Sequence, residues 1–161
     1  MEITQDRLKE LFIYHADGHL IWKVKKSKNV KIGGFAGSPN NEGYIHVQID
    51  RYKYKIHRLI FLWHFGFVPN LIDHTDQNKQ NNKIENLRAA TNSENLRNRP
   101  KQSNNTTGFK GVSFHKPTNK FQAKIKINKQ QIYLGLFLAA EDAYAAYCIA
   151  AKKYHHEFWS V

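Results

Sequence analysis

Residues 71–98 read LIDHTDQNKQNNKIENLRAATNSENLRN, and this stretch decides the fold of the first part of the chain. A short apolar run ends in Asp73 and His74, and a polar segment rich in turn-forming residues follows, from Thr75 to Leu87. This polar segment has no hydrophobic period. It therefore predicts a long loop between two short strands.

A helix is predicted soon after the second strand. Thr91 is followed three residues later by Glu94, which is the spacing of a capping box. The helix would begin at Asn92 with Thr91 as its N-cap. Asn95 would then lie one turn into the helix, where it can face the hairpin behind it.

The ordered set of polar residues resembles the ββα-metal motif of HNH endonucleases, in the His-Asn-Asn variant of phage and intron-encoded homing enzymes. Asp73 and His74 match the Asp-His that ends the first strand of the motif. Residues 86–88, Asn-Leu-Arg, match the second strand, and Asn95 matches the last polar residue, on the helix. An Asp-His pair alone is usually a surface turn, but the complete ordered set is much harder to obtain by chance.

The resemblance implies a role for each of four residues. His74 would be the general base that activates water, and Asn86 would orient its imidazole. Asp73 and Asn95 would hold one divalent metal ion. Histidine suits a base near pH 7, and carboxylate and amide oxygens suit Mg²⁺ or Mn²⁺.

The composition indicates a polyanionic partner. The chain of 161 residues has 25 Lys and Arg against 13 Asp and Glu, which gives a net charge of +12 and a pI near 9.8. This excess of positive charge makes double-stranded DNA the expected partner. No membrane partner is expected, because no apolar run approaches the length of a membrane span. A solvated basic surface is the weaker alternative.

The residues present argue against a nucleotide-binding protein and against a protein built on disulfides or cysteine-bound zinc. Gly33, Gly34 and Gly37 lack the spacing of a dinucleotide-binding fingerprint, so no nucleotide cofactor is expected. Cys148 is the single cysteine, which excludes a disulfide framework and a cysteine-based zinc site. No secretory signal is visible, and we expect a cytoplasmic protein of a bacterial or phage-infected host cell.

The N-terminal part predicts two hairpins and two helices. Thr4 can cap a short helix from Gln5 to Phe12, and an Asp17-Gly18 turn predicts a hairpin after it. Alternating residues predict a second hairpin between Gly43 and Ile56, and a dense apolar run predicts a buried helix over residues 57–66. This order resembles the segment that precedes the nuclease motif in phage HNH enzymes.

His57 and Arg58 open the predicted buried helix. His57 could be mistaken for the first histidine of the motif. We favour a structural or phosphate-contacting role for both residues, because His74 matches the base better.

A cationic linker and a second module complete the chain. Between Asn95 and Ala140 there is no Asp or Glu but there are nine Lys and Arg, which suggests a face held against phosphate. Residues 99–107 form a basic linker. Strict alternation from Phe121 to Ile127, a third strand over Gln130 to Phe137 and a helix from about Glu141 predict a three-stranded antiparallel sheet on one helix.

The second module resembles the Apetala-type (ethylene-response-factor) DNA-binding domain. The resemblance is carried by the sequences GFKGVS at 108–113, LGLF at 134–137 and EDAYAAY at 141–147, while the Trp-Gly pair of the plant pattern is absent. The family lays its sheet in the major groove. Because lysine stands at most of the family's arginine positions, sequence reading would be weaker than in plant factors. The DNA-binding candidates of the whole chain are Arg58, Arg88, Arg97, Arg99, Lys101, Lys110, Ser113, His115, Gln122, Lys124 and Lys126.

The predicted fold class is α+β, a ββα-metal nuclease module followed by a sheet-on-helix module. The predicted domains are a nuclease domain at 1–98, with hairpins in 1–56, a helix at 57–66 and the motif at 71–98, then the linker and a DNA-binding domain at 108–161.

The expected function is metal-dependent hydrolysis of DNA by a monomer or homodimer, with 5′-phosphate and 3′-hydroxyl products. A non-catalytic DNA-binding regulator is the competing hypothesis, and an RNA-binding protein ranks below both.

Overall fold

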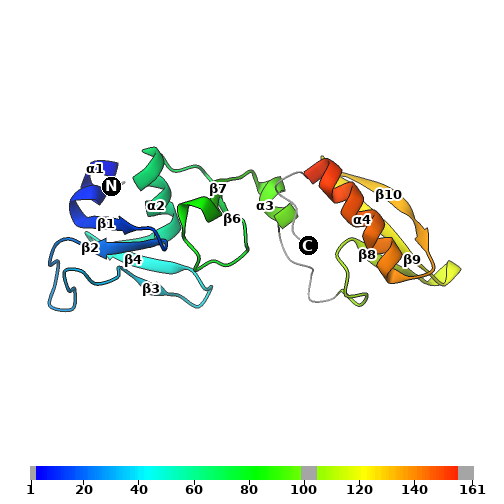
Figure 1. Cartoon of the computed structure of the whole chain (residues 1–161), viewed down its shortest axis with the longest axis horizontal. Helices are drawn as coiled ribbons and strands as arrows, with labels where there is room; N and C mark the ends of the chain where they lie inside the picture. Colours follow the sequence, from blue (N-terminus) through cyan, green and yellow to red (C-terminus); the bar gives the residue numbers. More distant parts are fainter. Residues whose placement is uncertain (1–2, 99–104, 156–161) are drawn as a thin grey trace. The chain divides into compact units, whose positions relative to one another are not determined.

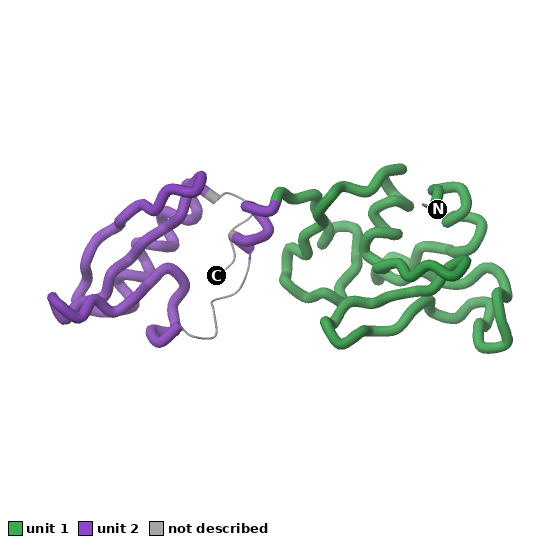
Figure 2. The backbone as a smooth tube through the Cα atoms, turned by 180° about the vertical axis from the view of Figure 1, so that it is seen from behind, with its two compact units in different colours: residues 1–91 green, residues 92–161 purple. Residues whose placement is uncertain are grey.

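The structure is a computed structural model that describes residues 3–98 and 105–155. The chain divides into two compact units, residues 1–91 and residues 92–161 (Figures 1 and 2). The division falls inside the nuclease domain predicted at 1–98, because the helix after Thr91 groups with the second unit. Each unit is described by itself below.

Unit 1 begins with a capped helix and a tight hairpin. In α1 (Gln5–Leu11) the side chain of Thr4 accepts a hydrogen bond from the backbone N–H of Arg7, as the sequence predicts. The chain then enters β1 (Phe12–His15), which pairs in antiparallel register with β2 (His19–Trp22). Phe12 therefore belongs to the strand and not to the predicted helix.

Gly18 in this hairpin turn meets another part of unit 1. Its φ is +85°, and a Cβ built there would lie 2.4 Å from the backbone nitrogen of Lys83 and 2.5 Å from the carbonyl carbon of Asn82. Glycine is required here for both its backbone angle and its missing side chain. The close approach ties the β1–β2 turn to the loop that follows His74.

A second sheet has the order β3-β4-β5, from β3 (Ser38–Pro39), β4 (Ile45–Ile49) and β5 (Tyr52–Lys55). The predicted turn lies between β4 and β5, where Asp50 and Arg51 both have positive φ. The short strand β3 precedes the predicted hairpin and adds a third strand to its sheet.

Helix α2 (Ile56–Phe65) provides the centre of the unit 1 core. Ile56, Leu59 and Ile60 are each at most 2% exposed, and Gly66 ends the helix in the left-handed conformation. The core also contains Leu8 and Phe12, both fully buried. Each such side chain contributes about 1.5–3 kcal/mol by leaving water.

The last elements of unit 1 carry the predicted motif. Strand β6 (Ile72–His74) pairs with β7 (Leu87–Ala89) in an antiparallel hairpin. The long loop between them is predicted correctly, and it contains one turn of 3₁₀ helix, η1 (Ile84–Asn86).

Unit 2 begins with α3 (Asn92–Asn98), which starts at the predicted residue. Its sheet has the order β10-β9-β8, from β8 (Val112–His115), β9 (Lys120–Ile127) and β10 (Gln130–Phe137), all antiparallel. A 3₁₀ turn, η2 (Lys116–Thr118), joins β8 to β9.

Helix α4 (Ala140–His155) packs on one face of this sheet (Figure 1). Ala123 and Ile125 on β9 are buried against Ala143, Tyr147 and neighbouring small residues of the helix. Small side chains let the helix lie close to the strands. The three strands and the helix are the elements that the alternation and the helical spacing predict.

In the part of the chain that the structure describes, small sheets combine with four α-helices, which agrees with the predicted α+β class. Because the β6–β7 hairpin and α3 belong to different units, the ββα-metal arrangement of these elements stays a prediction. Within the described ranges 3–98 and 105–155, no helix has both the length and the apolar character needed to cross a bilayer.

Candidate active site

The β6–β7 hairpin fixes the two residues that carry the expected chemistry. All three residues of β6 are buried, with Asp73 opposite Arg88 and His74 opposite Leu87. Successive residues of a strand point to opposite faces. Asp73 and His74 therefore have different surroundings although they are adjacent in the chain.

Asp73 is held by a buried ion pair. Its Oδ2 accepts hydrogen bonds from Arg88 Nη2 at 2.8 Å and from Arg88 Nε at 3.0 Å. The two side chains are 7% and 15% exposed. The predicted DNA contact of Arg88 therefore has to compete with a carboxylate that already accepts hydrogen bonds from two of its guanidinium nitrogens.

His74 is enclosed by polar and aromatic neighbours. Its Nε2 lies 3.1 Å from Oδ1 of Asn82, and its ring centroid lies 5.0 Å from that of His57, edge to face, and 6.2 Å from that of Tyr44. The residue is 5% exposed. A water molecule to be activated by this ring would have to be held at a small opening.

Asn86 is not the hydrogen-bonding partner of His74, in contrast to the role expected from the resemblance. Its Nδ2 donates to Oδ1 of Asp76 at 2.9 Å and to the backbone oxygen of Asn81 at 2.7 Å. Its Oδ1 accepts from the backbone N–H of Asp76 at 3.0 Å. Asn86 thus braces the loop, and Asn82 contacts the imidazole.

Asn82 is a residue that the sequence analysis missed. It is 1% exposed although it lies in a wholly polar stretch. Neither its type nor its spacing distinguishes it from Asn78 and Asn81 nearby, so the sequence offers no signal except the density of asparagines.

Burial lowers the pKa of both histidines in the site. Desolvation is the main cause of the lowered pKa of His74, partly opposed by the hydrogen bond with Asn82, and the shift favours the neutral imidazole. Desolvation, followed by the electrostatic interaction with His74, lowers the pKa of His57 to about 3. Positive charge on Lys55 and Arg58 acts in the same direction.

The lowered pKa of His57 predicts that acid reduces the free energy of unfolding of unit 1. As the pH falls below about 6.5, unfolded His57 takes up a proton that the folded state refuses until about pH 3. The stability contributed by neutral His57 is therefore complete above pH 6.5 and is lost progressively below it, at up to ~1.4 kcal/mol per pH unit. We expect His57→Phe to make the pH dependence shallower between pH 6.5 and 4, measured by urea denaturation. An unchanged dependence of the unfolding free energy on pH in this variant would contradict the lowered pKa of His57.

Cationic groups surround the aromatic side of the site. Tyr44 contacts the ring of His57 at 5.3 Å between centroids, and the Nζ atoms of Lys55 and Lys79 lie 4.1 and 4.9 Å from the centroid of its ring. Both distances are within the range of cation–π attraction. Two positive charges thus lie beside the aromatic group that touches both imidazoles.

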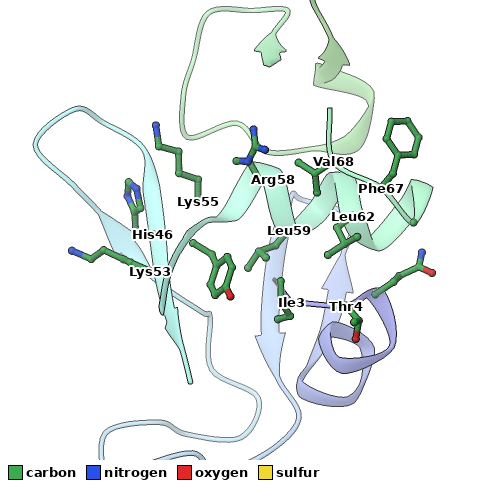
Figure 3. Close-up of a pocket in the computed structure, with 13 residues that line it drawn as sticks. Ile3, Thr4, His46, Lys53, Lys55, Arg58, Leu59, Leu62, Phe67 and Val68 are labelled. Carbon is green, nitrogen blue, oxygen red and sulfur yellow. The ribbon is translucent and has the colours of Figure 1, made fainter. Parts of the chain in front are cut away.

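Arg58 lines a pocket of about 750 Å³ beside α2 (Figure 3). Lys53 and Lys55 lie on its β5 side, and Leu59 and Leu62 on its helical side. The Nη1 of Arg58 donates to a backbone oxygen at 3.3 Å, that of Asn70. The pocket brings the DNA-binding candidate Arg58 together with two lysines that the sequence analysis did not single out.

The sheet of unit 2 collects several of the predicted DNA-binding residues. Ser113 lies opposite Gln122, and along β9 the residues Gln122, Lys124 and Lys126 alternate with those that face α4. Tyr133, which is 54% exposed, lies opposite Lys124 on β10 and joins the same face. We call Ser113, Gln122, Lys124, Lys126 and Tyr133 the outer sheet face.

The remaining candidates lie around this sheet or outside the described residues. His115 ends β8, with its Nδ1 2.8 Å from Oγ1 of Thr118, and burial lowers the pKa of Lys110 in the preceding loop. Arg97 is in α3, and its side chain is not described. Arg99 and Lys101 lie outside the described residues.

The predicted metal ligands fall in different units, Asp73 in unit 1 and Asn95 in unit 2. Among residues 3–98 and 105–155, no group of three or more His, Cys, Asp or Glu could hold a metal ion. Mg²⁺ needs no such group, because one or two carboxylates with water and substrate phosphate often suffice. The carboxylate of Asp73 fits that kind of site, and its sharing with Asn95 stays a prediction.

Residues 54–97 match the family model described as HNH endonuclease. The match begins in β5, includes α2 and the β6–β7 hairpin, and ends in α3. It covers well under half of the chain and supports nuclease action on DNA at a coarse level. HNH nucleases generally use a divalent metal ion. Comparison with curated proteins and with solved structures finds no match.

Proposed function

Taking the HNH endonuclease match over residues 54–97 as the starting point, we propose that this chain is a metal-dependent DNA endonuclease of the homing type. The observation that carries the proposal is the position of His74 at the end of β6, beside Asp73 and with its Nε2 3.1 Å from Oδ1 of Asn82. A neutral imidazole fixed in one orientation is the arrangement that a general base requires.

In the proposed reaction, His74 takes a proton from a water molecule, whose oxygen attacks the phosphorus atom of the scissile phosphodiester. The bond between phosphorus and the 3′ oxygen breaks, and that oxygen leaves and takes up a proton from a solvent water molecule. The products have 5′-phosphate and 3′-hydroxyl ends. Asp73, with Asn95 as the expected second ligand, would hold Mg²⁺ or Mn²⁺, which when bound neutralises charge on the phosphate and the leaving oxygen.

Within this proposal, the rest of the chain binds duplex DNA. Arg58 with Lys53 and Lys55 would contact phosphates from unit 1. The outer sheet face and the cationic residues before it would hold DNA from unit 2, in the manner of an Apetala-type domain. A chain acting as a monomer would nick one strand, whereas a homodimer could cut both.

A supercoiled plasmid tests the proposed activity. Incubation with the protein and Mg²⁺ or Mn²⁺ should yield nicked or linear DNA, and EDTA should abolish this conversion. DNA ligase should reseal the nicks without further treatment, because resealing requires a 5′-phosphate beside a 3′-hydroxyl. Failure of every metal to support cleavage would refute the endonuclease.

The competing function is a non-catalytic DNA-binding regulator that keeps the HNH fold as structure. Two observations favour it: His74 is only 5% exposed, and Asp73 is already paired with Arg88. A protein-dependent decrease in the gel mobility of the plasmid, without cleavage in either Mg²⁺ or Mn²⁺, would support the regulator.

The outer sheet face should contribute to the salt dependence of DNA binding. Replacing Lys124 and Lys126 by alanine should lower the slope of log K against log salt by about 0.9 for each lost phosphate contact. The matched control replaces Lys152 and Lys153, exposed on α4, which packs on the other face of the sheet. Equal slopes for the two double variants would exclude this face as the contact surface.

A further inference from the structure

We infer that Asn82 is a positioning residue that fixes the proton of neutral His74 on Nε2, so that the basic lone pair lies on Nδ1. This inference rests on the proposed role of His74 as a base. The position of the proton on the ring can nevertheless be measured without any cleavage, so the two ideas can fail separately.

The orientation of the Asn82 amide follows from its contact with the backbone. Its Nδ2 lies 3.1 Å from the carbonyl oxygen of Gln80. A carbonyl oxygen can only accept, so the amide group must present its nitrogen there. The amide oxygen, Oδ1, consequently faces Nε2 of His74 at 3.1 Å.

The orientation of the amide then selects the tautomer of the imidazole. An amide oxygen has no proton to give, so the ring nitrogen opposite it must be the donor. The other tautomer would set the lone pair of Nε2 against Oδ1 of Asn82. Because Asn82 is 1% exposed, solvent offers little compensation for two facing acceptors.

Two sets of contacts hold Asn82 in place. On one side, Asp76 accepts hydrogen bonds from the side chains of Asn81 and Asn86 at 2.7 and 2.9 Å and so closes the loop that carries Asn82. On the other side, the turn at Gly18 packs directly against the Asn82 backbone.

The imidazole is restrained by its aromatic neighbours. His57 meets it edge to face at 5.0 Å, and Tyr44 lies 6.2 Å away between centroids. When the ring accepts a proton at Nδ1, the Nε2–H bond to Asn82 becomes charge-assisted and stronger. Asn82 would thus both select the basic nitrogen and stabilise the imidazolium that forms.

The tautomer can be read directly in the wild-type chain. Histidine labelled with ¹⁵N gives a two-bond proton–nitrogen correlation pattern that differs between the Nδ1–H and Nε2–H forms, recorded at pH 8 where the ring is neutral. The His74 signals are assigned by their loss in His74→Gln. We expect the Nε2–H pattern, and an Nδ1–H pattern would overturn the inference.

Two substitutions distinguish a directing hydrogen bond between Asn82 and His74 from a role of Asn82 in packing alone. Asn82→Asp keeps an acceptor opposite Nε2 of His74 but loses the N–H donated to the carbonyl oxygen of Gln80, whereas Asn82→Leu has a similar volume and neither an acceptor nor a donor. We expect the aspartate variant to keep the Nε2–H form and the leucine variant to show a mixture of both forms. An unchanged Nε2–H pattern in the leucine variant would count against a directing role.

The cleavage assay adds a readout that a purely structural role would not produce. At saturating DNA, the single-turnover rate should fall ~10²-fold in Asn82→Leu and much less in Asn82→Asp, with the Kd for DNA nearly constant. Equal losses in both variants would overturn the inference. If the leucine variant does not fold, the wild-type spectrum alone decides; if the chain cleaves no DNA, the tautomer result is unaffected.

Discussion

His74→Ala is expected to lower the rate of DNA cleavage by at least ~10²-fold, because the variant has no group at this position to accept the proton of water. DNA binding should change little, since the imidazole is 5% exposed and the cationic groups of the chain stay in place. The two quantities are measured separately, as a single-turnover cleavage rate and as a Kd for duplex DNA in EDTA.

The matched control for this experiment is His15→Ala. His15 is an exposed histidine at the end of β1, outside the β6–β7 hairpin, so removal of its side chain should leave the cleavage rate unchanged. Full cleavage by His74→Ala would remove His74 from the role of base. Loss of DNA binding together with cleavage would instead indicate damage to the fold.

Arg88→Met should destabilise unit 1 by about 3–5 kcal/mol, which is the usual cost of removing one partner from a buried ion pair. The variant leaves the carboxylate of Asp73, 7% exposed, without the guanidinium that donates two hydrogen bonds to it. Methionine fills much of the space of the arginine stem, so lost charge and not lost volume would dominate.

The change is measured by urea denaturation followed by tryptophan fluorescence. Trp22 and Trp63 both belong to unit 1, and Trp159 is replaced by phenylalanine in every variant so that the signal reports unit 1. The control is Arg7→Met, which breaks a solvent-exposed ion pair with Glu10 and should have little effect. A similar small effect for Arg88→Met would show that the ion pair with Asp73 is not structurally important.

Several parts of the fold can be predicted from the sequence because their causes are local. The cap at Thr4, the left-handed turn residues Gly18 and Asp50, the end of α2 at Gly66 and the alternation along β9 depend mainly on neighbouring residues. Each sets backbone angles or a buried face within a few residues. The elements that they predict are the ones that the structure contains.

The candidate site is predictable in part. The sequence places Asp73 and His74 together at the end of a strand, and the family match over residues 54–97 agrees with the coarse nuclease prediction. The order of residues in a motif cannot show which of several asparagines reaches the imidazole. Asn86 was expected there and Asn82 is found, because the loop folds back on itself around Asp76.

The sequence by itself determined the helices, most of the strands and the basic character of the chain, because turn geometry, caps, alternation and net charge are properties of short segments or of composition. Only the tertiary structure decided that Arg88 pairs with Asp73, that Asn82 faces His74, and that Lys55 and Lys79 flank Tyr44. These pairings form between residues far apart in the sequence or across a folded loop. Their partners are selected by burial and by the direction of each side chain, which no local pattern specifies.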